Sequence, residues 1–325
     1  MSGVKLIAVA TDETDLRLDR WFRRRFPDLG YGRLAKWLRT GQVRVDGKRA
    51  KPGTRLAPGQ VVRVPPLADD MAGSAPPAPP VAVSEADVAA LHAAVLHRDG
   101  DLIALNKPAG LAVQGGSKTR RHLDRMLDAL SFGGERPRLA HRLDKDTSGV
   151  LLLARNRLAA ARLTRAFAGR KAVKSYWALV AGVPKPRRGR LDLPLVKGPS
   201  RTGERVRADV SSGRAAVTDY AVIDTAGRRA AWLALRPETG RTHQLRVHCA
   251  TMGTPIVGDG KYGGKRAFIA GISGKLHLHA RAIALPHPAS GQILRVEAPL
   301  VGHMAESWAF LGLDPDSARE PFDDG

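Results

Sequence analysis

The sequence predicts an α+β protein with a mixed sheet, preceded by a small basic module. Two observations carry this prediction. Beyond about Leu91, short apolar strand-like runs alternate with Gly/Pro turns and a few helical patterns, without a regular βαβ period. Before that, the stretch VPPLADDMAGSAPPAPP (64–80) interrupts regular structure, because proline lacks a backbone donor and fixes φ. A chain of 325 residues is also long enough for two domains.

We therefore expect four parts: a basic module at 12–66, a Pro/Ala-rich linker at 67–89, a larger domain at 90–310 and a loose acidic tail at 311–325. Within the larger domain the patterns predict helices at 121–130, 157–168 and 242–252. The tail DPDSAREPFDDG carries five acids and one arginine, which is typical of a loosely held terminus.

The basic module is predicted to contain two short helices and a hairpin. LRLDRWFRRRF (16–26) has a helical pattern with arginines on the face opposite its apolar residues. GYGRLAKWLRTGQ (30–42) predicts a second helix that turns Leu34, Trp37 and Leu38 inward. Asp46-Gly47 is a turn signal after an alternating strand, and a further strand is expected at 61–64.

Charge points to the partner. The formal net charge is +22, the pI is near 11.0, and residues 1–65 hold fifteen basic residues against six acidic ones. Basic side chains that neutralise phosphates release counterions, so nucleic acid is the leading partner. An anionic membrane surface is the alternative, but there is no 18-residue apolar run.

Cysteine usage and the N-terminus indicate the compartment. Cys249 is the single cysteine, which excludes an intrachain disulfide and favours a reducing environment. The opening MSGVKLIAVATDETD has too short an apolar stretch for a secretory signal. We expect a soluble cytoplasmic protein.

The stretch HRLDKDTSG (141–149) places several charges directly before the apolar run VLLLAR. Charges are buried at low cost only when they are paired. The stretch is therefore either a polar turn, in which Asp144 caps or forms a salt bridge with neighbouring residues, or a functional site. A hydrolase triad of His141, Asp144 and Ser148 lacks a Gly-x-Ser-x-Gly elbow.

Other chemistries fit less well. His243 and His248 are five residues apart, unlike the four of HExxH, and no cysteine or acid cluster accompanies His277 and His279, so no metal site is predicted. The glycines of GDGKYGG (258–264) lack the strand–helix context of a dinucleotide site.

The basic module resembles the S4 RNA-binding domain through RLDRWFRRRF and RLAKWLRTGQVRVDGKRAKPGTRLAPGQVVRVP. In that family the second helix and the following turn grip structured RNA. The resemblance implies that the residues at these positions contact RNA by shape and phosphate rather than by base sequence, namely Arg33, Lys36, Arg39, Arg44 and Lys48.

The larger domain resembles the RluA-type pseudouridine synthases from about residue 96 to 299. The likeness rests on HRLDKDTSGVLLLARN, together with NKPAGLAV, KSYWALVAG and ETGRTHQLRVH in the same order. It implies a mostly antiparallel mixed sheet and isomerisation of uridine in RNA, without cofactor or metal. An S4 module in front is the arrangement of large-ribosomal-subunit members, and the RluC-like branch is most similar, which implies 23S rRNA as partner. We expect a monomer.

The resemblance also assigns residues by position. Asp144 corresponds to the catalytic aspartate, Arg246 to its ion-pair partner and Tyr176 to a residue that packs on the uracil. Arg142 would fill the stack vacated by the flipped nucleotide. The remaining residues expected at the substrate are His141, Arg241 and Lys107.

Two alternatives stay open. A tRNA-directed enzyme of the same family is the nearest one, although the S4 module argues against it. A non-enzymatic ribosome-assembly factor that binds RNA through the module alone is the other. The intact set of Asp144, Tyr176 and Arg246 argues against that second alternative.

Overall fold

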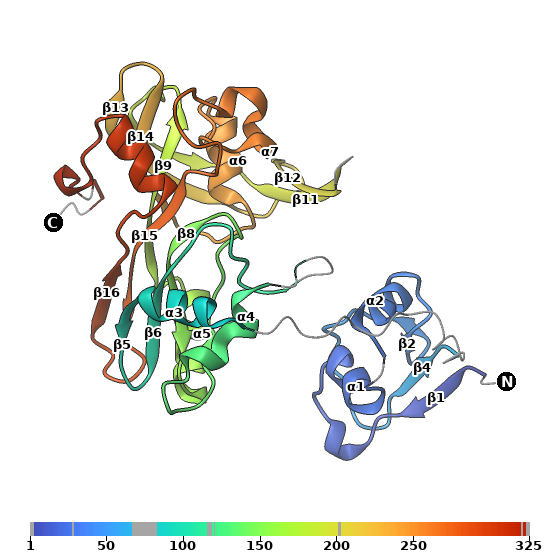
Figure 1. Cartoon of the computed structure of the whole chain (residues 1–325). Coiled ribbons are helices and arrows are strands. Elements are labelled where there is room, and N and C mark those ends of the chain that lie inside the picture. The colour runs from blue at the N-terminus through green and yellow to red at the C-terminus, as the bar shows by residue number, and fades with distance from the viewer. Residues whose placement is uncertain are drawn as a thin grey trace. The chain divides into compact units, whose positions relative to one another are not determined.

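The computed structural model describes residues 3–27, 29–66, 83–115, 119, 121–200, 203–319 and 321–322. The chain forms two compact units, Met1–Val81 and Ala82–Gly325 (Figure 1). Most of the predicted linker, residues 67–82, lies outside the described residues. Each unit is described by itself.

The N-terminal unit packs two helices on a four-stranded sheet. The helices are α1 (Leu18–Arg25) and α2 (Tyr31–Arg39). The strands follow the order β1-β4-β2-β3, with bounds Lys5–Ala8, Val61–Val64, Arg44–Val45 and Lys48–Arg49. Asp46 and Gly47 both have positive φ, as a tight hairpin turn requires. Both predicted helices and the predicted hairpin are therefore present.

The core of this unit is the one that the apolar spacing predicts. Leu34, Trp37 and Leu38 are buried, and they pack with α1 and with the valines of β2 and β4. Glu13 is buried at the edge of this core, where it accepts hydrogen bonds from Trp21 Nε1 and from Arg25. The Arg25 bonds hold the pKa of Glu13 down at about 2, so this buried acid stays ionised.

The larger unit is built on one mixed sheet. Its main path runs β10-β13-β14-β9-β15-β8-β6-β5, with β16 beside β15 and β7 beside β8. Among the described strands of this sheet, only β15 and β8 pair in parallel. The predicted mixed, mostly antiparallel α+β fold is therefore confirmed. The strands are β5 (Val95–Arg98), β6 (Leu102–Lys107), β7 (Arg138–Leu139), β8 (Ser148–Ala154), β9 (Val173–Ala181), β10 (Arg188–Asp192), β13 (Val217–Ala226), β14 (Ala230–Pro237), β15 (Leu278–Pro286) and β16 (Ile293–Glu297).

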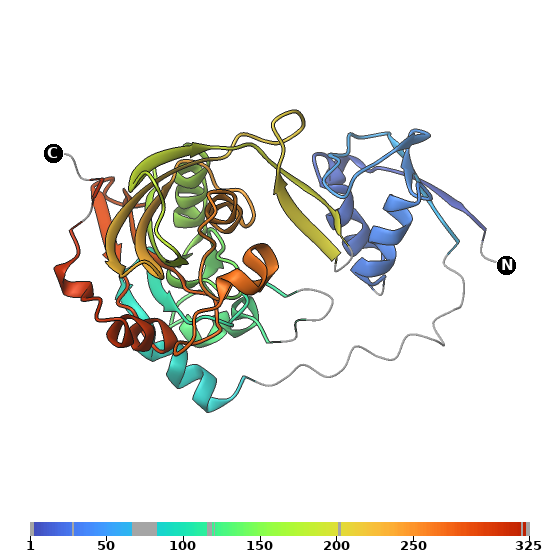
Figure 2. The same ribbon diagram turned by 90° about the horizontal axis from the view of Figure 1, so that it is seen from above.

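Helices cover both faces of this sheet because its central strands are apolar on both sides. In β8, Leu151 and Leu153 pack toward α3 (Glu85–Ala93) and α4 (Leu123–Met126), whereas Leu152 packs toward α5 (Arg157–Ala168). Further along, β9 and β14 lie between α6 (Gln244–Thr251) and α8 (His303–Phe310). The unit also contains α7 (Gly260–Gly263) and a separate hairpin of β11 (Leu195–Ser200) and β12 (Gly203–Ala208), which projects from the sheet (Figure 2).

Three predicted boundaries need correction. Residues 85–89 of the expected linker begin helix α3, whose first turn is capped by Ser84 accepting from the Asp87 N–H. The helix expected at 121–130 is α4 followed by a 3₁₀ turn at Leu127–Leu130. The helix expected at 242–252 begins two residues later, because His243 has a left-handed backbone.

The C-terminal tail is not loose where it is described. Leu313 is buried with α8, and Phe322 is buried against Ala221 and Ala234. The guanidinium of Arg236 lies 4.7 Å from the centre of the Phe322 ring. Apolar burial and the contact with Arg236 thus hold this acidic segment against the unit. No helix among the described residues is long and apolar enough to cross a membrane.

Candidate active site

A cleft of about 600 Å³ opens in the larger unit. Three segments line it: the 141–147 turn before β8, the end of α5 with the start of β9, and the 237–246 loop that leads into α6. Asp144, Tyr176 and Arg246, which the sequence assigns to one site, all lie in this cleft. Arg142 and Arg241 also line it.

Main-chain contacts fix the turn that carries Asp144. The Thr147 N–H donates to the Asp144 carbonyl at 3.2 Å, and the Gly110 N–H donates to the Lys145 carbonyl at 2.9 Å. After the turn, Gly149 has φ of 104°, and a Cβ there would lie 2.2 Å from the Ala280 oxygen. Glycine is therefore required where β8 meets β15.

Lys107 supports this turn instead of contacting substrate, which corrects the prediction. Its side chain is 1% exposed and does not line the cleft. Its ammonium donates to the carbonyls of Pro108, Leu111 and Lys145 at 2.8, 2.9 and 3.0 Å. Burial lowers the pKa of Lys107 to about 8, although the charges of Asp146 and Asp144 oppose the shift.

The imagined hydrolase triad is absent. Ser148 is buried, and its Oγ lies 2.8 Å from Nδ1 of His279, on the neighbouring strand. His279 Nε2 lies 3.0 Å from the Ala298 carbonyl, and His277 lies 2.7 Å from Ser307 Oγ. These histidines hold strands and a helix together.

Arg246 is not paired with Asp144. Its guanidinium forms two bonds with Asp259, at 2.8 and 2.7 Å, and the Asp259 side chain is fully buried. Burial acts to lower the pKa of Arg246, but the bond with Asp259 outweighs it, so the net shift is upward. The predicted ion pair with Asp144 is therefore wrong in this structure.

His243 is the neighbour of Asp144 that the motif comparison misses. Its Nε2 lies 3.8 Å from Asp144 Oδ2, and its Nδ1 lies 2.7 Å from the Tyr262 hydroxyl. From the sequence alone, His243 is considered only as a metal ligand, and Tyr262 and Asp259 only as part of a glycine-rich turn. The position of His243 within RTHQLR, three residues before Arg246, is the signal that could have identified it.

Tyr176 and the cationic residues complete the cleft. Tyr176 alternates with Trp177 along β9 and packs with the core clusters beneath α4 and α6. Burial and the Asp144 charge raise the pKa of Tyr176, so its phenol is neutral. Arg142 is exposed at the cleft, and two further cations, Arg170 and Lys174, also line it.

His141 lines the cleft but is held by the fold. Its Nε2 accepts the Leu152 N–H at 2.9 Å, and its ring stacks on Phe167 with centroids 4.4 Å apart. Burial, with the Lys174 charge, lowers the pKa of His141 to about 3. A neutral ring that accepts a main-chain bond supports β8, and the predicted contact of His141 with substrate stays a prediction.

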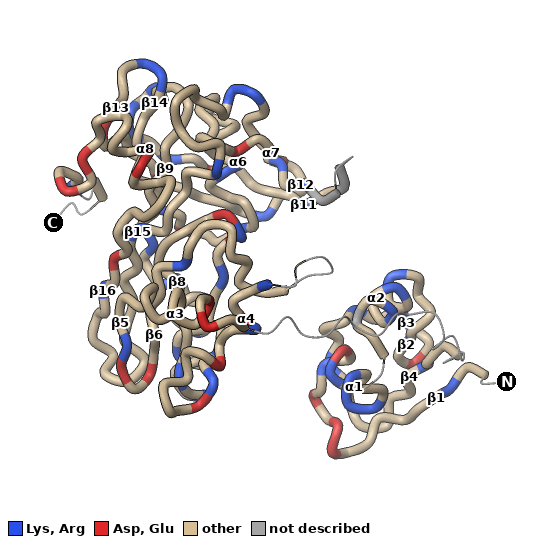
Figure 3. Tube along the Cα trace, in the orientation of Figure 1, with Lys and Arg blue, Asp and Glu red and all other residues tan. Residues whose placement is uncertain are grey.

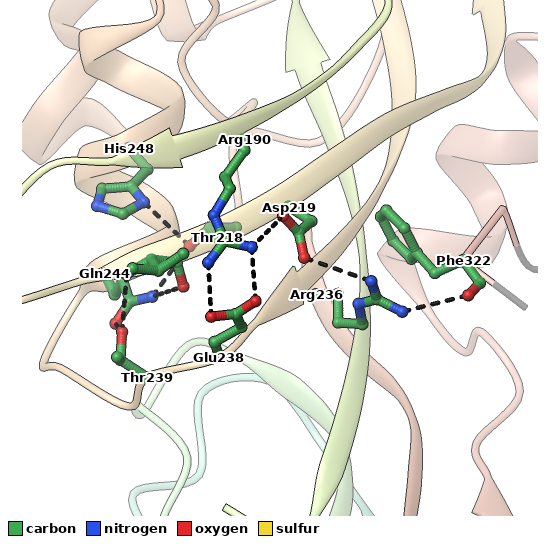
Figure 4. Close-up of polar contacts among 10 residues, drawn as sticks. Arg190, Thr218, Asp219, Arg236, Glu238, Thr239, Gln244, His248 and Phe322 are labelled. Atoms are coloured by element: carbon green, nitrogen blue, oxygen red, sulfur yellow. Dashed lines mark hydrogen bonds and ion pairs between the residues drawn. The ribbon is translucent and has the colours of Figure 1, made fainter.

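A polar network holds the 237–246 loop of the cleft lining to strands β10 and β13 (Figure 4). Gln244 accepts from the Thr239 hydroxyl and the Arg241 N–H, and donates to Thr218 and to the Val217 carbonyl. Arg190 donates two hydrogen bonds to the two carboxylate oxygens of Glu238, in a bidentate ion pair. Arg241 donates from Nε to the Ala215 carbonyl at 3.1 Å. These bonds hold the loop in place by contacts within the protein, without a contribution from substrate.

A group outside the cleft has the spacing of metal ligands. Ligand atoms of Asp99, Asp101 and His287 lie within 4.8 Å of one another. Asp99 already accepts two main-chain N–H bonds and contacts the rings of His97 and His287. These contacts explain the cluster as a brace between loops.

The five cations predicted to bind RNA lie in the N-terminal unit, where Figure 3 shows basic residues along α1 and α2. Lys36, Arg39 and Lys48 are exposed. Arg33 is half-buried with its guanidinium 5.0 Å from the Trp37 ring centre. Arg44 donates to the Gly41 and Gly47 carbonyls, so it supports the hairpin turn as well.

Comparison with known proteins identifies the family. Residues 101–251 match the RNA pseudouridylate synthase family. The ribosomal large subunit pseudouridine synthase C of Salmonella typhimurium is 36% identical over 316 residues, which cover 92% of this chain and 93% of that protein. The protein of the same name from Escherichia coli K12 is 35% identical with the same coverage.

Two solved human structures agree. Human RNA pseudouridylate synthase domain containing 4 superposes with a TM-score of 0.59 at 31% identity, covering 70% of this chain and 96% of that one. Human RNA pseudouridylate synthase domain containing 1 gives 0.52 at 26% identity, with the same coverage. The chain is therefore a member of the RluA-type RNA pseudouridine synthases, enzymes that isomerise uridine in RNA.

Proposed function

We propose that this enzyme converts specific uridines of the large-subunit (23S) ribosomal RNA to pseudouridine, with Asp144 as the catalytic aspartate. The observation that carries the proposal is the placement of the Asp144 carboxylate in a cleft of about 600 Å³ lined by cations. A volume of this size accommodates a single extruded nucleotide. The names of the relatives support the choice of RNA. A cytoplasmic site of action follows from that substrate.

The reaction breaks the N1–C1′ bond and forms a C5–C1′ bond, while the C5 proton is lost and N1 gains one. Asp144 would act beside C1′ and the base, with the ring of Tyr176 packed on the uracil. Arg142, exposed at the mouth, would fill the vacated stack. Arg241, Arg170 and Lys174 would neutralise backbone phosphates of the flipped nucleotide.

In the proposal the N-terminal unit is an S4-type RNA-binding domain. Its two helices and hairpin carry exposed cations on α2 and β3. A cationic surface of this kind provides affinity and register, while the cleft performs the chemistry.

The test is pseudouridine mapping of total RNA from cells with and without the gene. Loss of pseudouridine at discrete 23S rRNA positions is the expected result, and a plasmid copy should restore it. Loss confined to tRNA would replace the proposed substrate with the tRNA alternative. An unchanged RNA profile would contradict the proposal.

A further inference from the structure

We propose that His243 is the positioning residue of Asp144: Tyr262 fixes its tautomer, and its Nε2–H then orients the Asp144 carboxylate for reaction. The inference rests on the proposed catalytic role of Asp144. Among the described residues, His243 Nε2 is the one basic-side-chain nitrogen within 4 Å of the Asp144 carboxylate, at 3.8 Å from Oδ2. This distance exceeds that of a hydrogen bond, as is common for catalytic contacts before substrate binds.

Arg246 does not take this role in the arrangement observed. Its Nε and one terminal nitrogen are bound to the two oxygens of Asp259. Its guanidinium also lies 5.1 Å from the centre of the Tyr262 ring. Arg246 therefore packs on the ring of Tyr262, the tyrosine that contacts His243. It interacts with Asp144 only as a nearby positive charge.

The tautomer belongs to the proposal and is chosen to fit the contacts of Tyr262. The phenolic oxygen accepts the Val206 N–H at 3.3 Å, and we assign its own proton to the 2.7 Å contact with His243 Nδ1. An imidazole that accepts at Nδ1 carries its proton at Nε2. In this tautomer the proton is on the ring nitrogen that faces Asp144.

The surroundings keep His243 neutral. Burial lowers its pKa, and the charges of Arg246 and Lys261 act in the same direction, against those of Asp144 and Asp259. A neutral donor can hold the carboxylate without removing its charge or its basicity. A second cation at this position would instead weaken both.

The backbone of His243 supports a specialised role. Its φ is 55° and ψ is 19°, in the left-handed region, at the residue before α6. Few non-glycine residues adopt this conformation, and it clusters at functional sites. The ring at this residue lies within 3.8 Å of Asp144 in the 141–147 turn.

Three substitutions separate the two ring nitrogens. In His243→Gln the side-chain amide reaches the Nε2 position and can donate to Asp144. In His243→Asn the amide reaches only the Nδ1 position, toward Tyr262, and asparagine is the better residue for a left-handed backbone. His243→Leu provides neither group.

We expect kcat to fall roughly 10- to 100-fold in the Leu and Asn variants, with Gln retaining more activity and KM unchanged within about twofold. Tyr262→Phe should lower kcat about threefold to tenfold, since it removes one hydrogen bond. Tyr220→Phe is its control, because the Tyr220 hydroxyl binds the Pro186 carbonyl outside the cleft. Melting curves of all variants accompany the kinetics.

Wild-type kcat in folded His243→Leu, or better activity in Asn than in Gln, would overturn the inference. A loss confined to KM would do the same, since it indicates substrate binding. Asp144→Asn is assayed in parallel. If that variant is active, the proposed role of Asp144 fails; if it is inactive while His243→Leu is fully active, only the positioning role of His243 fails.

Discussion

Arg246 is bound through two nitrogens by Asp259, a carboxylate that is fully buried and follows it by thirteen residues. Asp259 also caps α7 by accepting the Tyr262 N–H. The pair therefore joins α6 to the segment that carries Tyr262. The arginine that the family resemblance places at the catalytic aspartate is, in this conformation, part of the frame around it.

The first prediction concerns this pair. Asp259→Ala leaves a buried guanidinium without its partner, and the free energy of unfolding should fall by about 3–5 kcal/mol. Arg246→Ala should cost a similar amount and also abolish most activity. Urea denaturation followed by circular dichroism measures the change. Arg138→Ala, which breaks the exposed pair with Glu135 in the same unit, is the control and should alter stability little.

The second prediction concerns Asp144. Asparagine has nearly the same shape but is neither nucleophilic nor basic. Asp144→Asn should therefore fold and bind RNA, while turnover falls by a factor on the order of 10⁴ or more. Tritium release from 5-³H-uridine RNA measures the reaction at C5.

Asp146, two positions further along the same turn, is the matched control. It is exposed and does not line the cleft. Asp146→Asn should retain activity. Substantial tritium release from folded Asp144→Asn would show that the carboxylate only braces the turn.

The third prediction concerns acid stability. His141 has a pKa of about 3 in the folded chain and 6.5 as its ordinary value. Between these values the unfolded chain binds the extra proton, so stability rises with pH and is lost as the pH falls from 6.5 toward 3. One such group contributes a slope of up to about 1.4 kcal/mol per pH unit.

His141→Gln tests this dependence, because the amide oxygen can still accept the Leu152 N–H while the titration is removed. Urea unfolding at several pH values between about 4 and 7 should give a shallower slope for the variant than for the wild type. Parallel slopes would mean that other groups, such as His277 and His279, account for the acid sensitivity.

The fourth prediction concerns the N-terminal unit. Replacing Lys36, Arg39 and Lys48 by glutamine should weaken RNA binding and flatten its dependence on salt, by about 0.7–0.9 in slope for each phosphate that is no longer neutralised. Fluorescence anisotropy at several salt concentrations measures this. Arg24→Gln is the control, since Arg24 is paired with Asp12; an equal reduction per charge there would indicate that net charge alone matters.

The sequence predicts those helices and strands whose apolar spacing and capping residues are evident within the segment itself. The helix at 157–168 has its apolar residues at helical spacing and an Asn156 cap, and the structure places it at those residues. Helix α3 is not evident from the sequence because it is rich in alanine, has little amphipathic contrast and adjoins the proline stretch. Phe322 lies in a segment that we expected to be loose. Its ring packs on Ala221 and Ala234, which are distant in the sequence, so the acidic stretch itself gives no sign of this contact.

In the candidate site, too, the sequence predicts which residues meet but not the contacts that each of them makes. The motif letters place Asp144, Tyr176 and Arg246 in one cleft, as found. They cannot show which oxygen each cation binds, because that depends on segments that meet only in the folded chain. Lys107 finds its acceptors up to 38 residues away, and Arg246 finds Asp259 beyond the end of its helix.

The Lys107 ammonium has a further consequence for how this enzyme can diversify. It holds the Asp144 turn through the carbonyl oxygen of Lys145, a main-chain group that every amino acid possesses, so this bond does not require particular side chains at 145 and 146. Both of those side chains are exposed. Substitution at these two positions can therefore change the surface charge beside the cleft while the main chain that carries the Asp144 carboxylate stays in place.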